Sequence, residues 1–389
     1  MAPIRVALIG LSSSASSWAV GAHLPYLLST RGRERFIIVA LCNSSVDAAQ
    51  RAIEKYGLAG NIKAYGDPEE VAADPNVDLV VCCTRVDLHY NNILPSVKAG
   101  KTAYVEWPLA HDVHSARELT SIARQSGSRT VVGNQGRLAP VVLKLREMLR
   151  QGRIGKVLSS EVRAAGGSFE GDVVPAPYKY LTQRAFGGNV VTISFSHLWD
   201  IFQFVLGEVT ELHPRLQIQY PTIRVLDQTT MTVTETVESD VPDLIIITAT
   251  MPSSETVIAD ATLLFRFCRG QPFPGETALT WIINGEKGKI RLVSPTSFAL
   301  HATAYRSPVT LEVHDSTSDR VELVDWAWSN WQEELPVIAR NVGAVYEAIA
   351  DQEESSIQSF ESATSRLEQV HGMLATIRQP QKEVDAAHC

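Results

Sequence analysis

The sequence predicts an α/β fold in which a doubly wound parallel sheet is followed by a second α/β domain with a large, mostly antiparallel sheet. The chain of 389 residues is longer than one hydrophobic core usually organises. Its first third alternates short apolar runs with helical patterns, and the rest is rich in strand patterns until a helical C-terminal stretch. We therefore expect one domain over residues 1–137 and another over residues 138–389, with C-terminal helices that can pack back on the first.

In the first domain, residues 4–10 form an apolar run that ends in Gly10, which is typical of a buried strand entering a tight turn. Further strands are expected at residues 36–42, 77–83, 102–106 and 129–134. Helices are expected between them at residues 18–28, 46–56, 89–99 and 114–125. Strands and helices at this spacing form right-handed βαβ units, so the sheet should be parallel.

The pattern changes after an expected helix at residues 140–151. Strand candidates follow at residues 157–164, 244–251, 261–268, 280–284 and 289–293. A helix is expected at residues 186–206, opening after a pair of glycines, and helical periodicity returns over residues 333–377. The irregular stretches between the strands indicate one large, mostly antiparallel sheet.

Composition excludes several classes of function. The 35 basic and 43 acidic residues give a net charge of −8 without any basic block, so direct binding of nucleic acid is not expected. The five cysteines are odd in number and lack CxxC spacing, which predicts neither disulfides nor a metal site. We read no signal peptide and no membrane span, and expect a cytoplasmic protein, or a nucleocytoplasmic one if it is a regulator.

The turn after the first strand is the place where the pyrophosphate of a dinucleotide would bind. Gly10 matches the first position of the Gly-x-Gly-x-x-Gly fingerprint, and Ser12 and Ala15 stand at its second and third positions. Small residues keep the backbone open to a phosphate, and the hydroxyl groups of Ser12, Ser13 and Ser14 add donors. A structural turn without a ligand is the alternative for this segment taken alone.

The position after the second strand decides between cofactors. An acidic residue there would bind the ribose of NAD, but this chain has Asn43 and Ser44. No carboxylate is present to repel a 2′-phosphate. We therefore expect NADP or NAD as cofactor, with NADP(H) bound at least as well as NAD(H).

Five further segments stand at a characteristic spacing. They are residues 77–84 followed by His89, the tripeptide Glu106-Trp107-Pro108, residues 134–137, the set Gly187-Gly188…His197…Asp200, and residues 281–290. Together they make the chain resemble the glucose–fructose oxidoreductase / inositol dehydrogenase / MocA family over almost its whole length. The resemblance implies an N-terminal Rossmann domain whose nicotinamide cofactor is also contacted by Thr84, His89, Glu106 and Trp107.

A narrower resemblance rests on residues 10–12, 17–20, 105–107, 135–137 and 241–243, and on His23 and Pro25. They are similar to a fungal branch of the family that includes the repressor of the galactose regulon. That repressor binds a dinucleotide but acts by binding a transcriptional activator. The resemblance implies a fungal protein and leaves enzyme and regulator open.

The family's catalytic residues are only partly present. In family dehydrogenases a lysine, an aspartate and a histidine surround the reacting carbinol. Trp107 stands at the position of the lysine and Ile193 at that of the aspartate. Neither side chain can act as an acid or a base. His197 stands at the histidine and is the expected acid/base, with a packing role as its alternative.

A nearby loop could replace the missing groups. Lys179 could supply the cation, and Tyr178 or Tyr180 could donate a proton. Exposed loop positions are the alternative for all three. Substrate contacts are expected from Gln135, Arg137, Trp107 and Ile193. Arg137 could equally form an ion pair between the domains.

The function that follows is that of an NAD(P)-dependent oxidoreductase acting on a small carbonyl or hydroxyl substrate. Its expected context is fungal specialised metabolism, and its active site is atypical because it lacks the family lysine and aspartate. One alternative is a non-catalytic, dinucleotide-sensing regulator that binds another protein. A second is a redox-neutral isomerase or lyase on the same fold. The open face of the large sheet is expected to pair two subunits in a homodimer.

Overall fold

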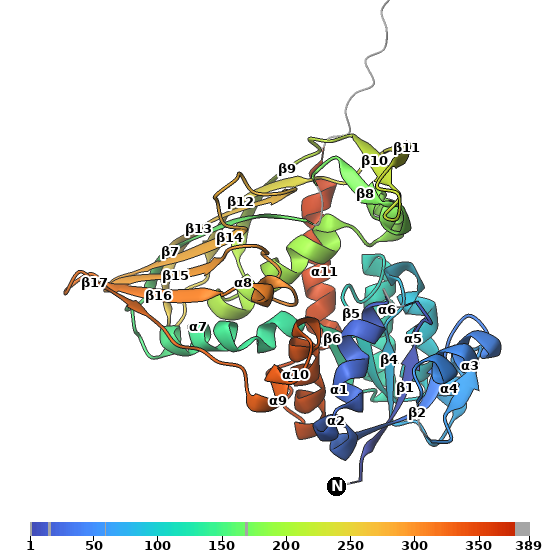
Figure 1. The fold of residues 1–389 in the computed structure, drawn as a ribbon. Coiled ribbons are helices and arrows are strands. Elements are labelled where there is room, and N and C mark those ends of the chain that lie inside the picture. Colours follow the sequence, from blue (N-terminus) through green and yellow to red (C-terminus); the bar gives the residue numbers. More distant parts are fainter. Residues whose placement is uncertain (1, 15–16, 59, 168–169, 378–389) are drawn as a thin grey trace, which may run out of the picture.

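The computed structural model describes residues 2–14, 17–58, 60–167 and 170–377. The first domain is built on a six-stranded parallel sheet with the strand order β3-β2-β1-β4-β5-β6 (Figure 1). Its strands are β1 (Ile4–Ile9), β2 (Phe36–Cys42), β3 (Lys63–Tyr65), β4 (Leu79–Cys82), β5 (Thr102–Glu106) and β6 (Thr130–Gly133). The predicted fold class is confirmed for this domain.

The order of the strands places a switch point between β1 and β4. The chain moves outward from β1 to β3 in one direction, and then from β4 to β6 in the other. In open α/β sheets a ligand binds in the crevice at such a switch, beyond the carboxyl ends of the strands. Gly10 and Cys83 follow β1 and β4 directly, so the predicted dinucleotide turn lies at this crevice.

Helices cover both faces of the sheet, which explains why its strands read as continuous apolar runs. One face packs against η1 (Ala19–His23), α1 (Leu24–Leu28), α3 (Val46–Lys55) and α10 (Val337–Asp351). The other packs against α4 (Pro68–Ala73), α5 (His89–Lys98), α6 (Val113–Ser126) and α11 (Phe360–Ala375). Val6, Ala7 and Leu8 of β1 have no solvent exposure.

The last two helices belong spatially to the first domain. Tyr346 of α10 stacks on Tyr26 of α1, with ring centres 5.4 Å apart and planes 9° apart. Phe360 and Leu367 of α11 share a hydrophobic core with Leu119 of α6. The chain therefore leaves the first domain after β6, builds the second, and returns to complete the first.

The second domain is an eight-stranded sheet with helices on one face, as the sequence predicts (Figure 1). The order is β17-β16-β15-β14-β7-β13-β12-β9, and only the β13–β7 pair is parallel. The strands are β7 (Val157–Gly166), β9 (Thr210–Gln217), β12 (Leu244–Met251), β13 (Val257–Arg269), β14 (Leu279–Gly285), β15 (Gly288–Ser294), β16 (Thr310–Asp315) and β17 (Arg320–Leu323). Alternate residues of the central strands share a core with α7 (Pro140–Arg150) and α8 (Ser196–Leu206).

The helix expected at residues 186–206 begins later. Asn189 caps η6 (Val190–Phe195), accepting from the amides of Val191 and Thr192 at 2.9 and 3.0 Å, and α8 follows without a break. Gly187, at φ +74°, precedes this start and packs against His111, where a Cβ would lie 2.4 Å from the His111 Cα. This left-handed glycine prevents the helix from extending back to residue 186.

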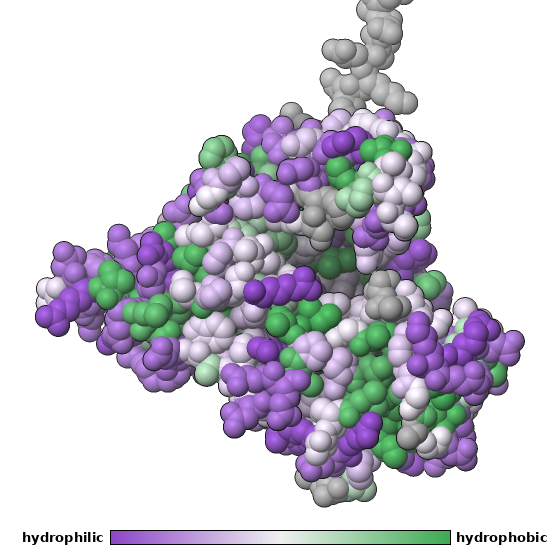
Figure 2. All heavy atoms as spheres, in the orientation of Figure 1, coloured by the Kyte–Doolittle hydropathy of each residue, from purple (hydrophilic) through white to green (hydrophobic). Residues whose placement is uncertain are grey.

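Several short elements were not predicted. A three-stranded sheet of β8 (Val173–Pro175), β10 (Thr222–Leu226) and β11 (Val233–Glu238) lies at one end of the large sheet, and η4 (Ala176–Thr182) follows β8. In the space-filling view the surface is hollowed between the two domains, with hydrophobic residues inside the hollow (Figure 2). Among the residues described, no helix has the length and apolar character needed to traverse a lipid bilayer.

Candidate cofactor and substrate site

A cavity of about 700 Å³ lies at the switch point between β1 and β4. Its walls include the predicted residues Gly10, Ser12, Ser13, Ser14, Asn43, Ser44 and Thr84. The third fingerprint position, Ala15, lies outside the described residues. A volume of this size, open at the carboxyl ends of parallel strands, suits a dinucleotide. We call it the cofactor cavity.

Gly10 brings the backbone close to the neighbouring strand. Its φ is +94°, and a Cβ there would lie 2.7 Å from Thr84 Cγ2 and 3.1 Å from the backbone carbon of Cys83. Only glycine fits this conformation and this approach without displacement. The turn after β1 is therefore shaped for a ligand near its backbone, which supports the fit of a dinucleotide.

Side chains from α3 and the residue after it hold the serine loop. The Tyr56 hydroxyl donates to the Ser12 carbonyl at 2.8 Å, and Lys55 Nζ donates to the Ser13 carbonyl at 2.5 Å. Ser12 Oγ accepts from the Ser14 amide at 3.1 Å. The loop is thus fixed by contacts to its carbonyl oxygens.

The ribose end of the cavity has no acid. Asn43 Nδ2 donates to the Leu11 carbonyl at 3.0 Å, so this amide ties the second strand's end to the glycine turn. Ser44 is exposed beside it. Among the described residues that line the cavity, Arg85 carries the only charge.

Replacing Gly10 with alanine is expected to lower dinucleotide affinity at least tenfold and to destabilise the fold by about 1–3 kcal/mol, because the methyl group meets Thr84 in a left-handed conformation. Titration calorimetry and urea unfolding measure the two effects. Gly57→Ala is the matched control, since Gly57 has φ +56° but open space around its Cα. Equal behaviour of the two variants would contradict the steric argument.

A second cavity of about 190 Å³ adjoins the first, and Cys83, Thr84 and Arg85 line both. Seven of the predicted site residues line it: Thr84, His89, Glu106, Trp107, Tyr180, Ile193 and His197. We call it the central cavity.

Three predicted cofactor contacts also bind protein groups. The ring nitrogens of His89 lie 2.8 Å from the Pro108 carbonyl and 2.9 Å from the Thr84 carbonyl. Glu106 Oε1 lies 2.7 Å from His23 Nε2, and His23 is fully buried. Trp107 Nε1 donates to the Thr192 carbonyl at 2.7 Å, so the indole that replaces the family lysine ties β5 to η6.

His197 faces the central cavity as a neutral imidazole. Burial lowers its pKa to about 4, although Asp200 opposes this. Its ring stacks on His301, with centres 3.9 Å apart and planes 13° apart. Burial and His197 together lower the pKa of His301 well below the ordinary value. Repulsion disfavours a state in which both stacked rings are charged, and burial, the larger cause for each ring, favours the neutral form of both.

The three loop residues expected to replace the missing groups, Tyr178, Lys179 and Tyr180, lie in different places. Tyr180 lines the central cavity, where burial raises its pKa and keeps the phenol protonated. Tyr178 lines the cofactor cavity instead. Lys179 Nζ forms an ion pair with Oε2 of Glu235, a residue of β11, at 2.6 Å. Lys179 lines neither the central cavity nor the cofactor cavity.

Arg85 and His301 are site residues that sequence reasoning missed. The Arg85 guanidinium lies 5.1 Å from the centre of the Tyr180 ring, and it is the one arginine or lysine among the described residues that line the central cavity. Its Nε and Nη2 donate to the Asp87 carboxylate at 2.6 and 2.7 Å. Its signal was its place directly after Thr84, at the carboxyl end of the third predicted strand. His301 lies in an irregular segment, which offered no signal.

Two predicted substrate contacts, Gln135 and Arg137, belong to residues 134–137, which we call the crossing segment because it leads from the first domain to the second. They do not line the central cavity. Arg137 binds Asp200 through Nε and Nη2, both at 2.7 Å, and Asp200 also accepts from Arg366 Nε at 3.2 Å. The side chain of Gln135 is fully buried. Neither residue lines the cofactor cavity or the central cavity.

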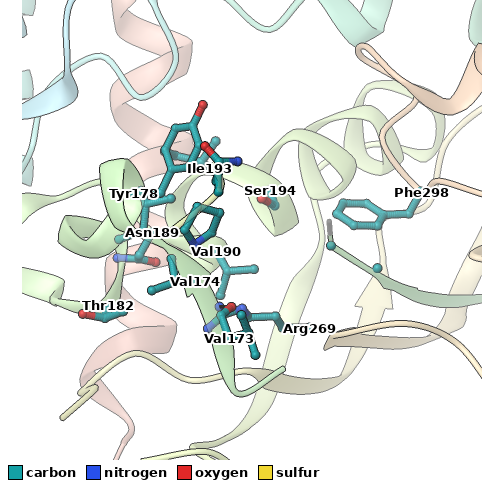
Figure 3. Close-up of a pocket in the computed structure, with 15 residues that line it drawn as sticks. Val173, Val174, Tyr178, Thr182, Asn189, Val190, Ile193, Ser194, Arg269 and Phe298 are labelled. Carbon is teal, nitrogen blue, oxygen red and sulfur yellow. Dashed lines mark hydrogen bonds between the residues drawn. The ribbon is translucent and has the colours of Figure 1, made fainter. Parts of the chain in front are cut away.

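A third cavity of about 540 Å³ is lined by residues of β8, η4 and η6, and by Arg269 and Phe298 (Figure 3). Ile193 lines both the central and the third cavity, and Tyr178 lines both the third cavity and the cofactor cavity. The third cavity therefore shares a wall with each of the other two. Within the described part of the chain, no cluster of three or more His, Cys, Asp or Glu could hold a metal ion.

Comparisons with known proteins agree with this arrangement. A model described as an oxidoreductase family with an NAD-binding Rossmann fold matches residues 4–134, and one for the C-terminal domain of Gal80p matches residues 140–294. Dehydrogenase aclE of Aspergillus oryzae is 30% identical over 371 residues, which cover 95% of each chain.

Regulators are similar as well. The galactose/lactose metabolism regulatory protein GAL80 of Saccharomyces cerevisiae is 27% identical over 306 residues, covering 77% of this chain and 68% of that protein. A crystal structure of a super-repressor mutant of Gal80p from the same yeast has a TM-score of 0.82 at 23% identity, covering 95% of each chain, and shows the same fold. The chain therefore belongs to the glucose–fructose oxidoreductase / inositol dehydrogenase / MocA family, and its second domain matches the C-terminal domain model of Gal80p.

Proposed function

We propose that the protein is an NAD(P)-dependent oxidoreductase that interconverts a hydroxyl and a carbonyl group on a small substrate. The walls that the three cavities share, with His197 lining the one that adjoins the dinucleotide turn, carry this proposal. The 30% sequence identity to a dehydrogenase, over 95% of this chain, supports it. A bound nicotinamide would supply the hydride acceptor or donor.

The residues of the central cavity would handle the proton. A neutral His197 can accept the proton of a substrate hydroxyl, because its pKa of about 4 leaves the ring unprotonated at neutral pH. The protonated Tyr180 phenol can donate a hydrogen bond to the substrate oxygen. Arg85 is the cation on the cavity wall, but its Nε and Nη2 already donate to Asp87, so the pair offers little net charge in place of the family lysine.

The direct test is incubation of the protein with NAD+ or NADP+ and a panel of hydroxyl compounds, followed by absorbance of the reduced cofactor. Turnover that depends on the protein supports the proposal. If neither dinucleotide binds at millimolar concentration, both the cofactor assignment and the reaction class are wrong.

Cofactor preference is expected to respond to one residue. Ser44→Asp should weaken NADP(H) about tenfold more than NAD(H), because a carboxylate would face the 2′-phosphate. Ser44 is preferable to Asn43 for this change, since the Asn43 amide holds Leu11. Ser44→Asn is the neutral control, and fluorescence titration measures both affinities. A wild type that strongly prefers NAD(H) would contradict the proposed preference.

A second candidate is a dinucleotide-sensing regulator that binds a protein partner. The 27% identity to GAL80 and the C-terminal domain shared with Gal80p favour it. In that case the dinucleotide would bind without turnover of any substrate. Co-purification of a transcriptional activator, together with an unreactive cofactor, would favour the regulator over the enzyme.

A further inference from the structure

Two side chains with spare hydrogen-bond donors line the third cavity. Arg269, at the end of β13, donates from Nη2 to the Val173 carbonyl at 2.6 Å and forms no ion pair with any described residue. Asn189 is 1% exposed, and its Nδ2 has no partner in the described chain, because only its Oδ1 is used in capping η6. The unused donors of these two residues could bind acceptors of a ligand.

The carboxylates nearest to Arg269 are already engaged. Asp172 pairs with Arg224 Nη2 at 2.7 Å, and Asp243 accepts from the amides of Gln219 and Tyr220, both at 2.8 Å. Burial lowers the pKa of Arg269 while Asp243 and Asp172 raise it, and a guanidinium keeps its proton at neutral pH. The cavity wall therefore carries a positive charge that no described carboxylate contacts.

The rest of the cavity is mainly apolar. Val173, Val174, Leu181, Val190 and Phe298 line it, and Arg269 is the only charged residue among the described lining residues. Figure 3 shows Phe298 at one side of the cavity, and Asn189, Val174 and Arg269 away from it. A ligand that fits these walls has an apolar body and one anionic group.

We propose that this cavity binds the carboxylate of an apolar hydroxy or oxo acid. The carboxylate would pair with Arg269, Asn189 Nδ2 would donate to a further ligand oxygen, and the carbon chain would lie on the valines. The hydroxyl group would pass Ile193 toward His197. In oxidation, a bound nicotinamide would accept the carbinol hydrogen as hydride, and His197 would accept the hydroxyl proton, so that a carbonyl group would remain. The placement of the reacting end rests on the proposed function, whereas the anion site does not.

The test uses octanoate as an anionic probe and octanamide as its neutral match, titrated calorimetrically into the full chain with and without NADP+. We expect octanoate to bind at least tenfold more tightly than octanamide. Arg269→Gln should abolish this difference. Arg266→Gln, an exposed arginine on the same strand, is the matched control and should retain it.

Asn189→Asp gives an independent variant. It keeps an oxygen that can cap η6 but replaces the unpartnered donor with a negative charge, so octanoate should bind at least tenfold more weakly. Equal binding of the two probes to the wild type would overturn the proposal. So would undiminished octanoate binding to folded Arg269→Gln, or to Asn189→Asp if Arg269→Gln does not fold. Binding of an acidic peptide but not of octanoate would also overturn it, in favour of a protein partner.

Turnover separates this proposal from the proposed function. The same protein is incubated with NAD(P)+ and a series of hydroxyoctanoates, and with the corresponding alcohols. Octanoate binding that depends on Arg269, without oxidation of any compound, supports the anion site and removes the oxidoreductase. Oxidation of neutral alcohols without octanoate binding does the reverse.

Discussion

Replacing His197 with alanine is expected to lower the turnover number by about 10²-fold or more, because the variant loses the group that accepts the substrate proton. Dinucleotide affinity should change little, since His197 lines the central cavity and not the cofactor cavity. His114→Ala, on the exposed side of α6, is the control and should behave as the wild type. Full activity of His197→Ala would exclude this residue and shift the acid/base role to Tyr180.

The pH profile gives a second check on His197. Because burial lowers its pKa to about 4, the basic form persists above that pH, and oxidation should lose rate only as the pH falls toward 4. An activity limb near the ordinary histidine pKa, absent from His197→Ala, would show that the ring is better solvated than the structure indicates. In a regulator, the same substitution would leave partner binding unchanged.

Replacing Asp200 with alanine is expected to destabilise the protein by about 3–5 kcal/mol, because it leaves the buried Arg137 guanidinium without a carboxylate and removes one of the two carboxylates of Arg366, which keeps Glu208. Asp200 is 1% exposed and joins α8 to the crossing segment through Arg137 and to α11 through Arg366. Urea unfolding at neutral pH measures the change in free energy of unfolding.

The control for this change is Glu368→Ala, which removes an exposed ion pair with Arg117 and should cost less than about 1 kcal/mol. Burial alone would raise the pKa of Asp200, but Arg137 and Arg366 hold it below its ordinary value. Its stabilising contribution is therefore present at neutral pH and is lost as the pH falls through the lowered pKa. A loss for Asp200→Ala no greater than that of the control would contradict the buried network.

The parts of the fold that could be predicted are those that bury a regular apolar pattern. β2 and β5 have the predicted bounds because both are apolar runs inside the first sheet. β11 was missed because its six residues are mostly exposed and only two of them, both valines, are apolar. That omission had a consequence for the site, because Glu235 of β11 is the residue that holds Lys179.

The candidate site divides in the same way. The turn after β1 and the residues matched to the family, Trp107, Ile193 and His197, come together because β5 and η6 meet at the central cavity. Arg137 could not be assigned from sequence, since its partner Asp200 lies 63 residues away and both roles required an arginine there. His301 reaches His197 only through the tertiary fold.

One side chain lines two of the three cavities in a way that couples them. Tyr178 lines both the cofactor cavity and the cavity beside Arg269, so its position would enter the affinity of both proposed ligands. Thermodynamic linkage then requires that whatever factor one ligand applies to the other's affinity is returned unchanged. Such reciprocity needs no chemical step. A shared wall of this kind can align two reactants, or it can make occupancy by one small molecule a readout of the concentration of another.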